Sequence, residues 1–113
     1  MNKEFFVHLF HILIVGSLFL YVGICRNKIP SWLYTGLLGL GVFIILYHAF
    51  SAYKYIKQGK SAWVNLFHIL IVGPLLIYIG YNNKATPFSA YQFLLMLGFA
   101  AIGYHGYYMF LNK

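Results

Sequence analysis

Hydrophobic residues form four long runs that short polar segments separate. The runs cover residues 5–25, 31–53, 62–81 and 87–110, to within a residue or two. Each has about 20 residues or more, the length that an α-helix needs to cross a hydrocarbon layer of ~30 Å. None alternates apolar and polar positions as a strand of a membrane barrel would. The pattern therefore predicts an all-α integral membrane protein with four spans.

The composition supports a lipid environment. The chain has 113 residues, of which 62% are hydrophobic and 8% are charged. So short a chain cannot bury this much apolar surface in a water-soluble core. The first run is longer than the apolar region of a signal peptide, and a near copy of it lies in mid-chain, so we interpret it as a permanent helix. The bilayer is the expected surrounding.

The chain contains an internal repeat. Residues 7–56 align without a gap with residues 64–113, and the phrase LFHILIVG occurs in both copies. Each copy is a two-span hairpin, so we predict one transmembrane domain over residues 1–113, built from repeats at about 5–56 and 62–113. Two spans return the chain to its starting side, which predicts a pseudo-twofold axis along the membrane normal. A four-helix bundle is the expected packing.

The basic residues lie at the ends of the runs and indicate an orientation. The net charge is +7. The side with both termini carries Lys3, Lys54, Lys57, Lys60 and Lys113, and the other side carries Arg26, Lys28 and Lys84. This excess predicts that both termini face the cytoplasm. The charges do not gather on one face and no nucleic-acid motif occurs, so we predict no nucleic-acid partner.

Four histidines recur in the repeat. His11 aligns with His68, and His48 aligns with His105. Each lies about six residues inside the same membrane face, which at ~1.5 Å per residue places all four roughly 9 Å deep. We predict that these imidazoles share one level of the bundle and face its interior. His8 aligns with Asn65, stands outside this pattern and is expected at the interface.

These histidines lead to a hypothesis of ligand binding. Imidazole is costly in lipid and usually functional there, and its neutral form is the commonest metal ligand. The leading hypothesis is a site near the cytoplasmic face that binds haem b or a transition-metal ion through His11, His48, His68 and His105. With haem, the chain would be an electron carrier resembling a b-type cytochrome.

Glycines and tyrosines near the histidines extend this hypothesis. Gly41 and Gly98 lie two turns deeper on the histidine stripes, where a missing side chain could admit a porphyrin edge. Tyr47 and Tyr104 adjoin the histidines and are expected to orient the imidazoles as hydrogen-bond partners. The same glycines could instead be grooves for close helix packing, as we expect for the seven-spaced pairs Gly16–Gly23 and Gly73–Gly80.

The same sequence is compatible with other functions. The histidines could serve structural hydrogen bonds between helices or conduct protons or ions. Glu4 is the only acidic residue, and no Ser-His-Asp set, phosphate loop or CxxC pair occurs, so no catalytic residues are predicted. Association into a homo-oligomer is compatible with the pattern. Pro74 replaces Ser17 and predicts a kink in the third helix.

A resemblance adds a non-enzymatic alternative. The segments NLFHILIVGPLLIYIGYNNK and LLMLGFAAIGYHGYY are similar to small multi-span proteins of large DNA viruses of algae and protists, whose functions are unassigned. The resemblance implies a virus-encoded membrane protein, whose termini would face the interior side of a virion membrane if it resides there. Such a protein could be a structural component whose termini and Lys54–Lys60 loop touch viral or membrane protein partners. It carries no active-site pattern to these residues.

Overall fold

A computed structural model describes residues 3–111, which are helical apart from short connections and contain no strand. The first helical segment consists of α1 (Lys3–Phe10), the π-helical η1 (His11–Gly16), α2 (Ser17–Cys25) and the 3₁₀ turn η2 (Arg26–Lys28). The second is α3 (Ser31–Lys57). The third consists of α4 (Trp63–Phe67), the π-helical η3 (His68–Val72), α5 (Gly73–Asn82) and the 3₁₀ turn η4 (Asn83–Ala85). The fourth is α6 (Phe88–Leu111).

Four helical segments are long and apolar enough to cross a membrane. They cover Phe5–Lys28, Ser31–Lys57, Trp63–Ala85 and Phe88–Leu111. Each contains nearly all of one predicted run and extends past the C-terminal end of that run by a few residues at most. The predictions of an all-helical chain and of four membrane-length helices are therefore confirmed for the described residues.

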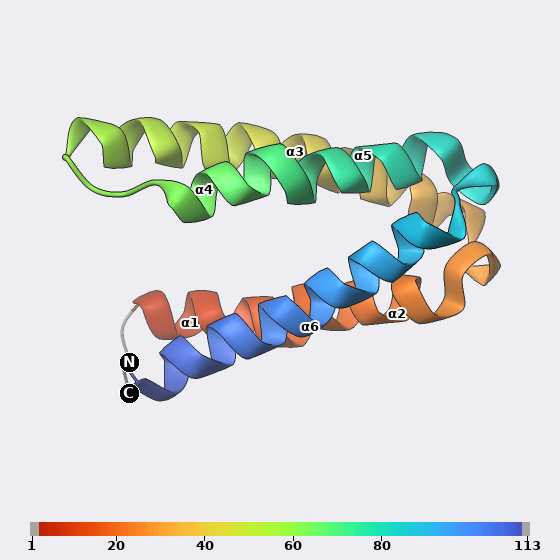
Figure 1. The fold of residues 1–113 in the computed structure, drawn as a ribbon, viewed down its shortest axis with the longest axis horizontal. Helices are drawn as coiled ribbons and strands as arrows, with labels where there is room; N and C mark the ends of the chain where they lie inside the picture. Colours follow the sequence, from red (N-terminus) through yellow and green to blue (C-terminus); the bar gives the residue numbers. More distant parts are fainter. Residues whose placement is uncertain (1–2, 112–113) are drawn as a thin grey trace. The chain divides into compact units, whose positions relative to one another are not determined.

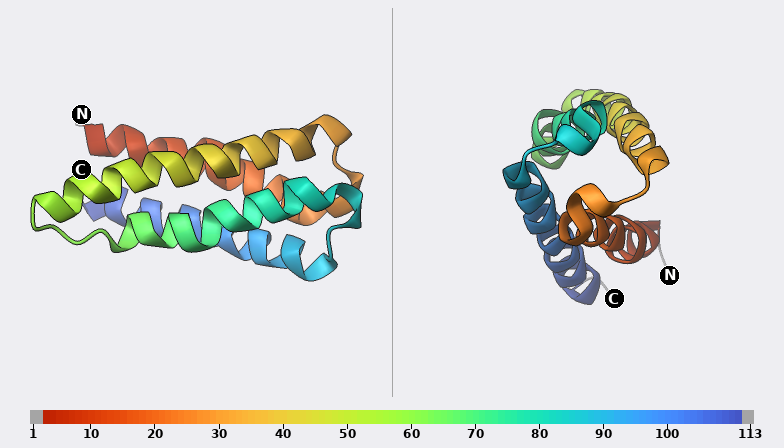
Figure 2. Two further views of the ribbon diagram at one scale, coloured as in Figure 1. Left: turned by 90° about the horizontal axis from the view of Figure 1, so that it is seen from above. Right: turned by 90° about the vertical axis from the view of Figure 1, so that its right-hand side faces the viewer.

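The helices pack in two compact units. Unit 1 comprises Met1–Lys28 and Pro87–Lys113, and in it α6 lies along α1, η1 and α2 (Figure 1). Unit 2 comprises Ile29–Thr86, and in it α3 lies along α4, η3 and α5 (Figure 2). Each unit thus pairs the first helix of one sequence repeat with the second helix of the other.

Glycines bring the paired helices of each unit close together. In unit 2, a Cβ atom built on Gly41 would lie 2.7 Å from the carbonyl oxygen of Gly73. In unit 1, a Cβ atom on Gly23 would lie 2.9 Å from Cα of Leu95. Small residues at helix crossings are the usual route to close packing in lipid. The predicted packing role of the seven-spaced glycines is confirmed.

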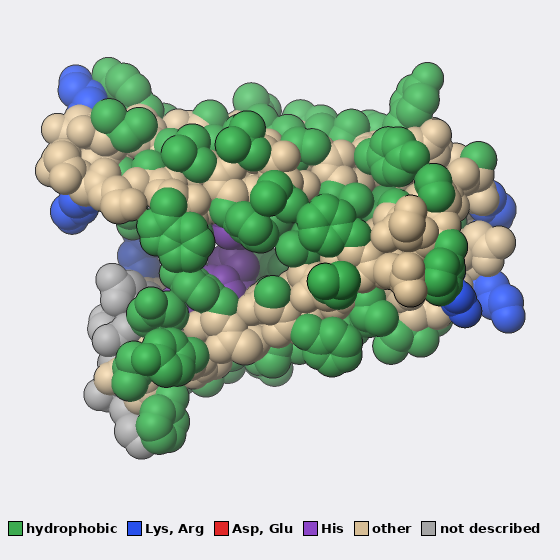
Figure 3. All heavy atoms as spheres, in the orientation of Figure 1, with side chains coloured by type: hydrophobic (Ala, Val, Ile, Leu, Met, Phe, Trp, Pro, Cys, Tyr) green, Lys and Arg blue, Asp and Glu red, His purple; other side chains and the backbone are tan. Residues whose placement is uncertain are grey.

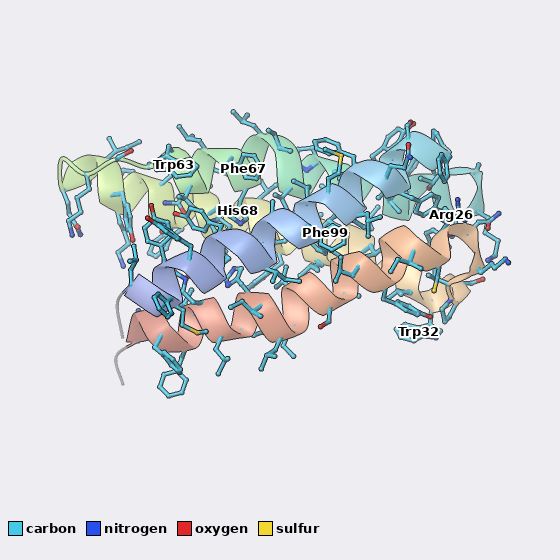
Figure 4. The ribbon with its side chains drawn as sticks, turned by 60° about the horizontal axis from the view of Figure 1, so that its bottom comes forward. Arg26, Trp32, Trp63, Phe67, His68 and Phe99 are labelled. Atoms are coloured by element: carbon cyan, nitrogen blue, oxygen red, sulfur yellow. The ribbon has the colours of Figure 1, made fainter. Side chains whose placement is uncertain are left out.

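The outer faces of the helices are apolar. Figure 3 shows hydrophobic side chains over the visible helix surfaces and Lys or Arg side chains at the helix ends. Leu46 and Leu70, which lie in mid-helix, are 66% and 70% exposed. In unit 2, Trp32 and Trp63 lie at opposite ends of the helix pair (Figure 4), as expected for aromatic residues at the two lipid–water interfaces.

Both copies of the repeat contain a π-helical segment at the same place. η1 and η3 each begin at a histidine of the shared phrase HILIV. Pro74 follows η3, but its counterpart Ser17 follows η1 and is no proline. The helix is therefore distorted in both copies, and the proline is not needed for it. This distortion begins ahead of Pro74, where the sequence predicted only a proline kink.

Candidate imidazole sites

A hydrogen bond joins two imidazole rings in unit 1. Nδ1 of His8 in α1 lies 2.8 Å from Nδ1 of His105 in α6. His105 is buried and His8 is half-buried. Because each Nδ1 of a neutral ring carries either the hydrogen or the lone pair, one ring must donate and the other accept. The two rings are therefore opposite tautomers when the pair is neutral.

His11 completes a cluster of three imidazoles in this unit. Its ring stacks on that of His105 with centroids 4.3 Å apart and planes inclined by 24°. Its Nδ1 lies 2.7 Å from the carbonyl oxygen of Val7, one turn earlier. A carbonyl only accepts, so Nδ1 of His11 carries the hydrogen and Nε2 carries the lone pair of the neutral ring.

Unit 2 repeats this arrangement with one replacement. The rings of His48 in α3 and His68 at the start of η3 stack with centroids 4.1 Å apart and planes inclined by 14°. Nδ1 of His68 lies 2.8 Å from the carbonyl oxygen of Val64. Nδ1 of His48 lies 2.7 Å from Oδ1 of Asn65, the residue that aligns with His8. An amide oxygen thus takes the place of the second hydrogen-bonded imidazole.

The structure brings the predicted histidines together in pairs. His11 meets His105 in unit 1, and His48 meets His68 in unit 2. The prediction that all four imidazoles lie at one depth of the bundle concerns residues of both units, and it stays a prediction. His8, which stands outside the repeated pattern, is part of the cluster in unit 1. Its predicted place at the membrane interface stays a prediction.

The predicted tyrosine neighbours lie edge-on to the histidines. The rings of Tyr47 and His48 have centroids 5.2 Å apart, and those of Tyr104 and His105 have centroids 5.1 Å apart. In both pairs the planes meet at 83°. The Nδ1 atoms of the two histidines bond to Asn65 and His8 rather than to tyrosine hydroxyls. The tyrosines can therefore limit ring rotation by contact.

Helix packing occupies the space beside the two glycines proposed for a porphyrin edge. A Cβ atom on Gly41 would also lie 2.8 Å from Cγ1 of Ile77. One on Gly98 would lie 3.1 Å from Cβ of Phe19 and from Cδ2 of Leu20. The close-packing alternative thus accounts for both positions.

The stacked rings do not have the geometry of two axial ligands of one haem. Axial nitrogens point at iron from opposite faces of the macrocycle, whereas rings stacked at 4.1 and 4.3 Å leave no layer between them for it. In residues 3–111, no group of three or more histidine, cysteine or carboxylate side chains is arranged to hold a metal ion. As they stand, the rings are better suited to hydrogen bonding than to coordination.

Comparison with known proteins identifies no relative, so the function is argued from the chemistry of these residues. No family model, curated protein or solved structure matches the chain. The resemblance to viral membrane proteins stays a prediction.

Sequence reasoning missed the hydrogen-bond partners of His48 and His105. His8 precedes His11 by three residues, and Asn65 precedes His68 by three, so each pair lies on one helix face. Both residue types can accept a hydrogen bond. This shared ability at aligned positions is the signal in the sequence that indicates a common role, although the two residue types differ.

The bond between His48 and Asn65 predicts a stability effect. Replacing Asn65 with leucine would leave the Nδ1–H of His48 without this acceptor in an apolar helix pair. We expect the free energy of unfolding to fall by about 1–3 kcal/mol, measured by denaturant titration in detergent micelles. Asn65→His restores an acceptor of the kind found in unit 1 and is expected to lose less than half as much. Equal losses for the two variants would contradict the assignment of this bond.

Proposed function

We propose that the chain is a multi-pass membrane protein that binds and passes protons through its paired imidazoles. The observation that carries this proposal is the hydrogen bond of 2.8 Å between His8 and His105. Ionisable residues within membrane spans are expensive and commonly mark proton pathways. Free imidazole titrates near neutral pH, so it can both take up and release a proton under ordinary conditions.

The pair can pass a proton in three balanced steps. A proton binds Nε2 of the donating ring and makes it an imidazolium. The hydrogen on its Nδ1 then crosses to Nδ1 of the partner, and the charge moves with it. The partner finally releases the hydrogen on its own Nε2. One proton has crossed, the total charge is unchanged, and the two rings have exchanged tautomers. The rings must return to the first tautomers before the next proton passes in the same direction.

The neighbours of the pair limit how much charge it holds. His11 stacks on His105, the ring of Tyr108 lies parallel to that of His8 at 6.4 Å, and Tyr104 contacts His105 edge-on. Two imidazolium ions at stacking distance repel each other strongly where little water screens them. The cluster is therefore suited to one excess proton at a time, as a relay requires.

Among the described residues, unit 2 has an amide in place of the second hydrogen-bonded ring. The amide of Asn65 accepts the hydrogen of His48 but neither takes up nor releases a proton near neutral pH. The same backbone arrangement is thus present once with a relay and once without. In the proposed orientation the relay lies near the cytoplasmic face, on the side of both termini.

Proton flux into liposomes tests the proposal. Purified protein is reconstituted with a pH-sensitive dye inside, and a potassium gradient with valinomycin supplies the driving force. We expect the internal pH to change faster than in protein-free liposomes, and His105→Ala to abolish the difference. A wild-type rate equal to that of protein-free liposomes would overturn the proposal.

Metal or haem ligation is the second candidate, and one observation favours it. His11, His48 and His68 each donate Nδ1–H to an oxygen. Metal-bound histidines almost always show this arrangement, because it leaves the lone pair on Nε2 and raises its basicity. Coordination by both rings of one pair would require them to rotate out of the stack. Haem would give the purified protein a Soret band that shifts on reduction, and a transition metal would give stoichiometric metal by elemental analysis.

The structural alternative would give a different set of results. In that case the purified protein would be colourless and free of metal, and it would transfer no protons. It would also form a homo-oligomer or copurify with other membrane proteins, in keeping with the structural role that the viral resemblance implies.

A further inference from the structure

We infer that the π-helical segments η1 and η3 are positioning elements. Each rotates the first helix of its repeat so that the hydrogen-bonding and stacking side chains before the segment lie on the same helix face as the packing glycine that follows. The inference deepens the proposed function and rests on it for its biological meaning. It concerns how His8 and His11 reach His105, and how Asn65 and His68 reach His48. The same segment in both copies is the observation that prompts it.

The sequence spacing shows why a regular α-helix would fail. His8 precedes Gly16 by eight residues, and Asn65 precedes Gly73 by eight. At about 100° per residue, eight residues of α-helix turn the chain through two turns and a further ~80°. The histidine level would then point well away from the packing face. Gly16 and Gly73 are both buried against the partner helix, so the two features could not share one contact surface.

A π turn removes this mismatch. It closes i→i+5 hydrogen bonds, so residues five apart take the relation that residues four apart have in an α-helix. His11 and Gly16 are five apart and lie at the two ends of η1. With one residue absorbed, the eight positions from His8 to Gly16 act as seven, which is close to two full turns. Unit 2 repeats this count from Asn65 to Gly73.

The contacts of unit 1 agree with this geometry. His8 and His11 contact His105, and Gly16 lies against Ile102, one turn earlier in the same helix α6. One continuous face of the first helix therefore meets one face of α6, across the π-helical segment. In unit 2, Asn65 and His68 contact His48, and Gly73 lies against Ile45. The first copy has Ser17 where the second has Pro74, so the proline cannot account for both π-helical segments. We attribute them to the shared phrase HILIV and to the helix packing that it permits.

Deleting one residue within each segment tests the inference. Leu13 and Leu70 are suitable because they align with each other and are exposed, at 56% and 70%. Without the extra residue the helix can become regular, and the seven positions that then separate the histidine level from the glycine keep nearly the rotation that the π turn provides. We expect the deletion of Leu13 to remove the π turn of the first helix and to keep both the bond between His8 and His105 and the bond between His48 and Asn65. The deletion of Leu70 should remove the π turn of the third helix and likewise keep both bonds.

Solid-state NMR on protein with ¹⁵N-labelled histidine reads out both bonds without relying on proton flux. A through-space correlation between the Nδ1 nuclei reports His8–His105, and the Nδ1 shift reports the donation by His48. Leu13→Ala and Leu70→Ala are the matched controls, because they remove nearly the same side-chain atoms and keep the chain length. Both controls should retain both bonds.

The outcomes separate this inference from the proposed function. Loss of the His8–His105 correlation after deletion of Leu13, or of the donation by His48 after deletion of Leu70, would overturn the positioning role, whatever the flux. Retention of both bonds in both deletions, with no flux in the wild type, would support the positioning role and overturn the relay.

Discussion

Replacing His8 with asparagine is expected to lower the proton transfer rate by about tenfold or more while the helix packing is retained. The reason is that unit 2 already shows asparagine at the aligned position, where Asn65 accepts the Nδ1 hydrogen of His48 at 2.7 Å. His105 can make the same bond to the asparagine amide in the His8→Asn variant, so the hydrogen bond persists but the route across two rings does not. The measurement is the initial rate of internal pH change in liposomes under a fixed membrane potential.

The reciprocal change provides the control. Asn65→His places a second imidazole beside His48 and builds in unit 2 the arrangement that unit 1 has. In a chain that also carries His8→Asn, we expect it to restore a measurable share of the lost rate, because the relay is then present in the other unit. A His8→Asn chain that transfers protons as fast as the wild type would contradict the relay. A slow rate accompanied by lower helicity than the wild type, by circular dichroism, would contradict the retained packing.

Replacing Gly41 with leucine is expected to destabilise unit 2 by about 3 kcal/mol or more. A Cβ atom there would already lie 2.7 Å from the carbonyl oxygen of Gly73 and 3.0 Å from the amide nitrogen of Ile77. These are backbone atoms, so the clash can be relieved only by moving α3 away from η3 and α5. The free energy of unfolding in detergent micelles, from denaturant titration, measures the effect.

Gly39 offers a matched control two residues away on the same helix. A Cβ atom on Gly39 would meet nothing within 4 Å, and the residue is exposed. Gly39→Leu is therefore expected to change the free energy of unfolding by less than about 1 kcal/mol, with a gain in helix propensity on its side. Equal effects at the two positions would mean that the close approach of the helices at Gly41 does not limit their packing.

Much of the fold follows from local properties of the chain. Long uncharged runs must form helices in lipid because only helix satisfies their backbone groups within the segment. The repeat likewise showed which histidines correspond, and the seven-spaced glycines indicated close packing. These features depend on residues near one another in sequence, so composition and spacing are sufficient to predict them.

The pairing of the helices was beyond the reach of the sequence. The two copies of the repeat present nearly the same apolar faces, so nothing in the pattern distinguishes His48 meeting His68 from His48 meeting His11. Packing decides between such partners through contacts summed over whole helix faces, including the glycine approaches of each unit. The same contacts decide that His105 bonds to His8 and stacks on His11.

The sequence by itself determined that this chain is made of four membrane-length helices in two related halves, with histidines at corresponding positions. Only the tertiary structure decided that His8 belongs with them, that Asn65 is its counterpart, and that both first helices contain a π-helical turn. A one-residue change of helical register leaves the apolar composition untouched. It becomes visible when the side chains of a second helix show which way each imidazole must face.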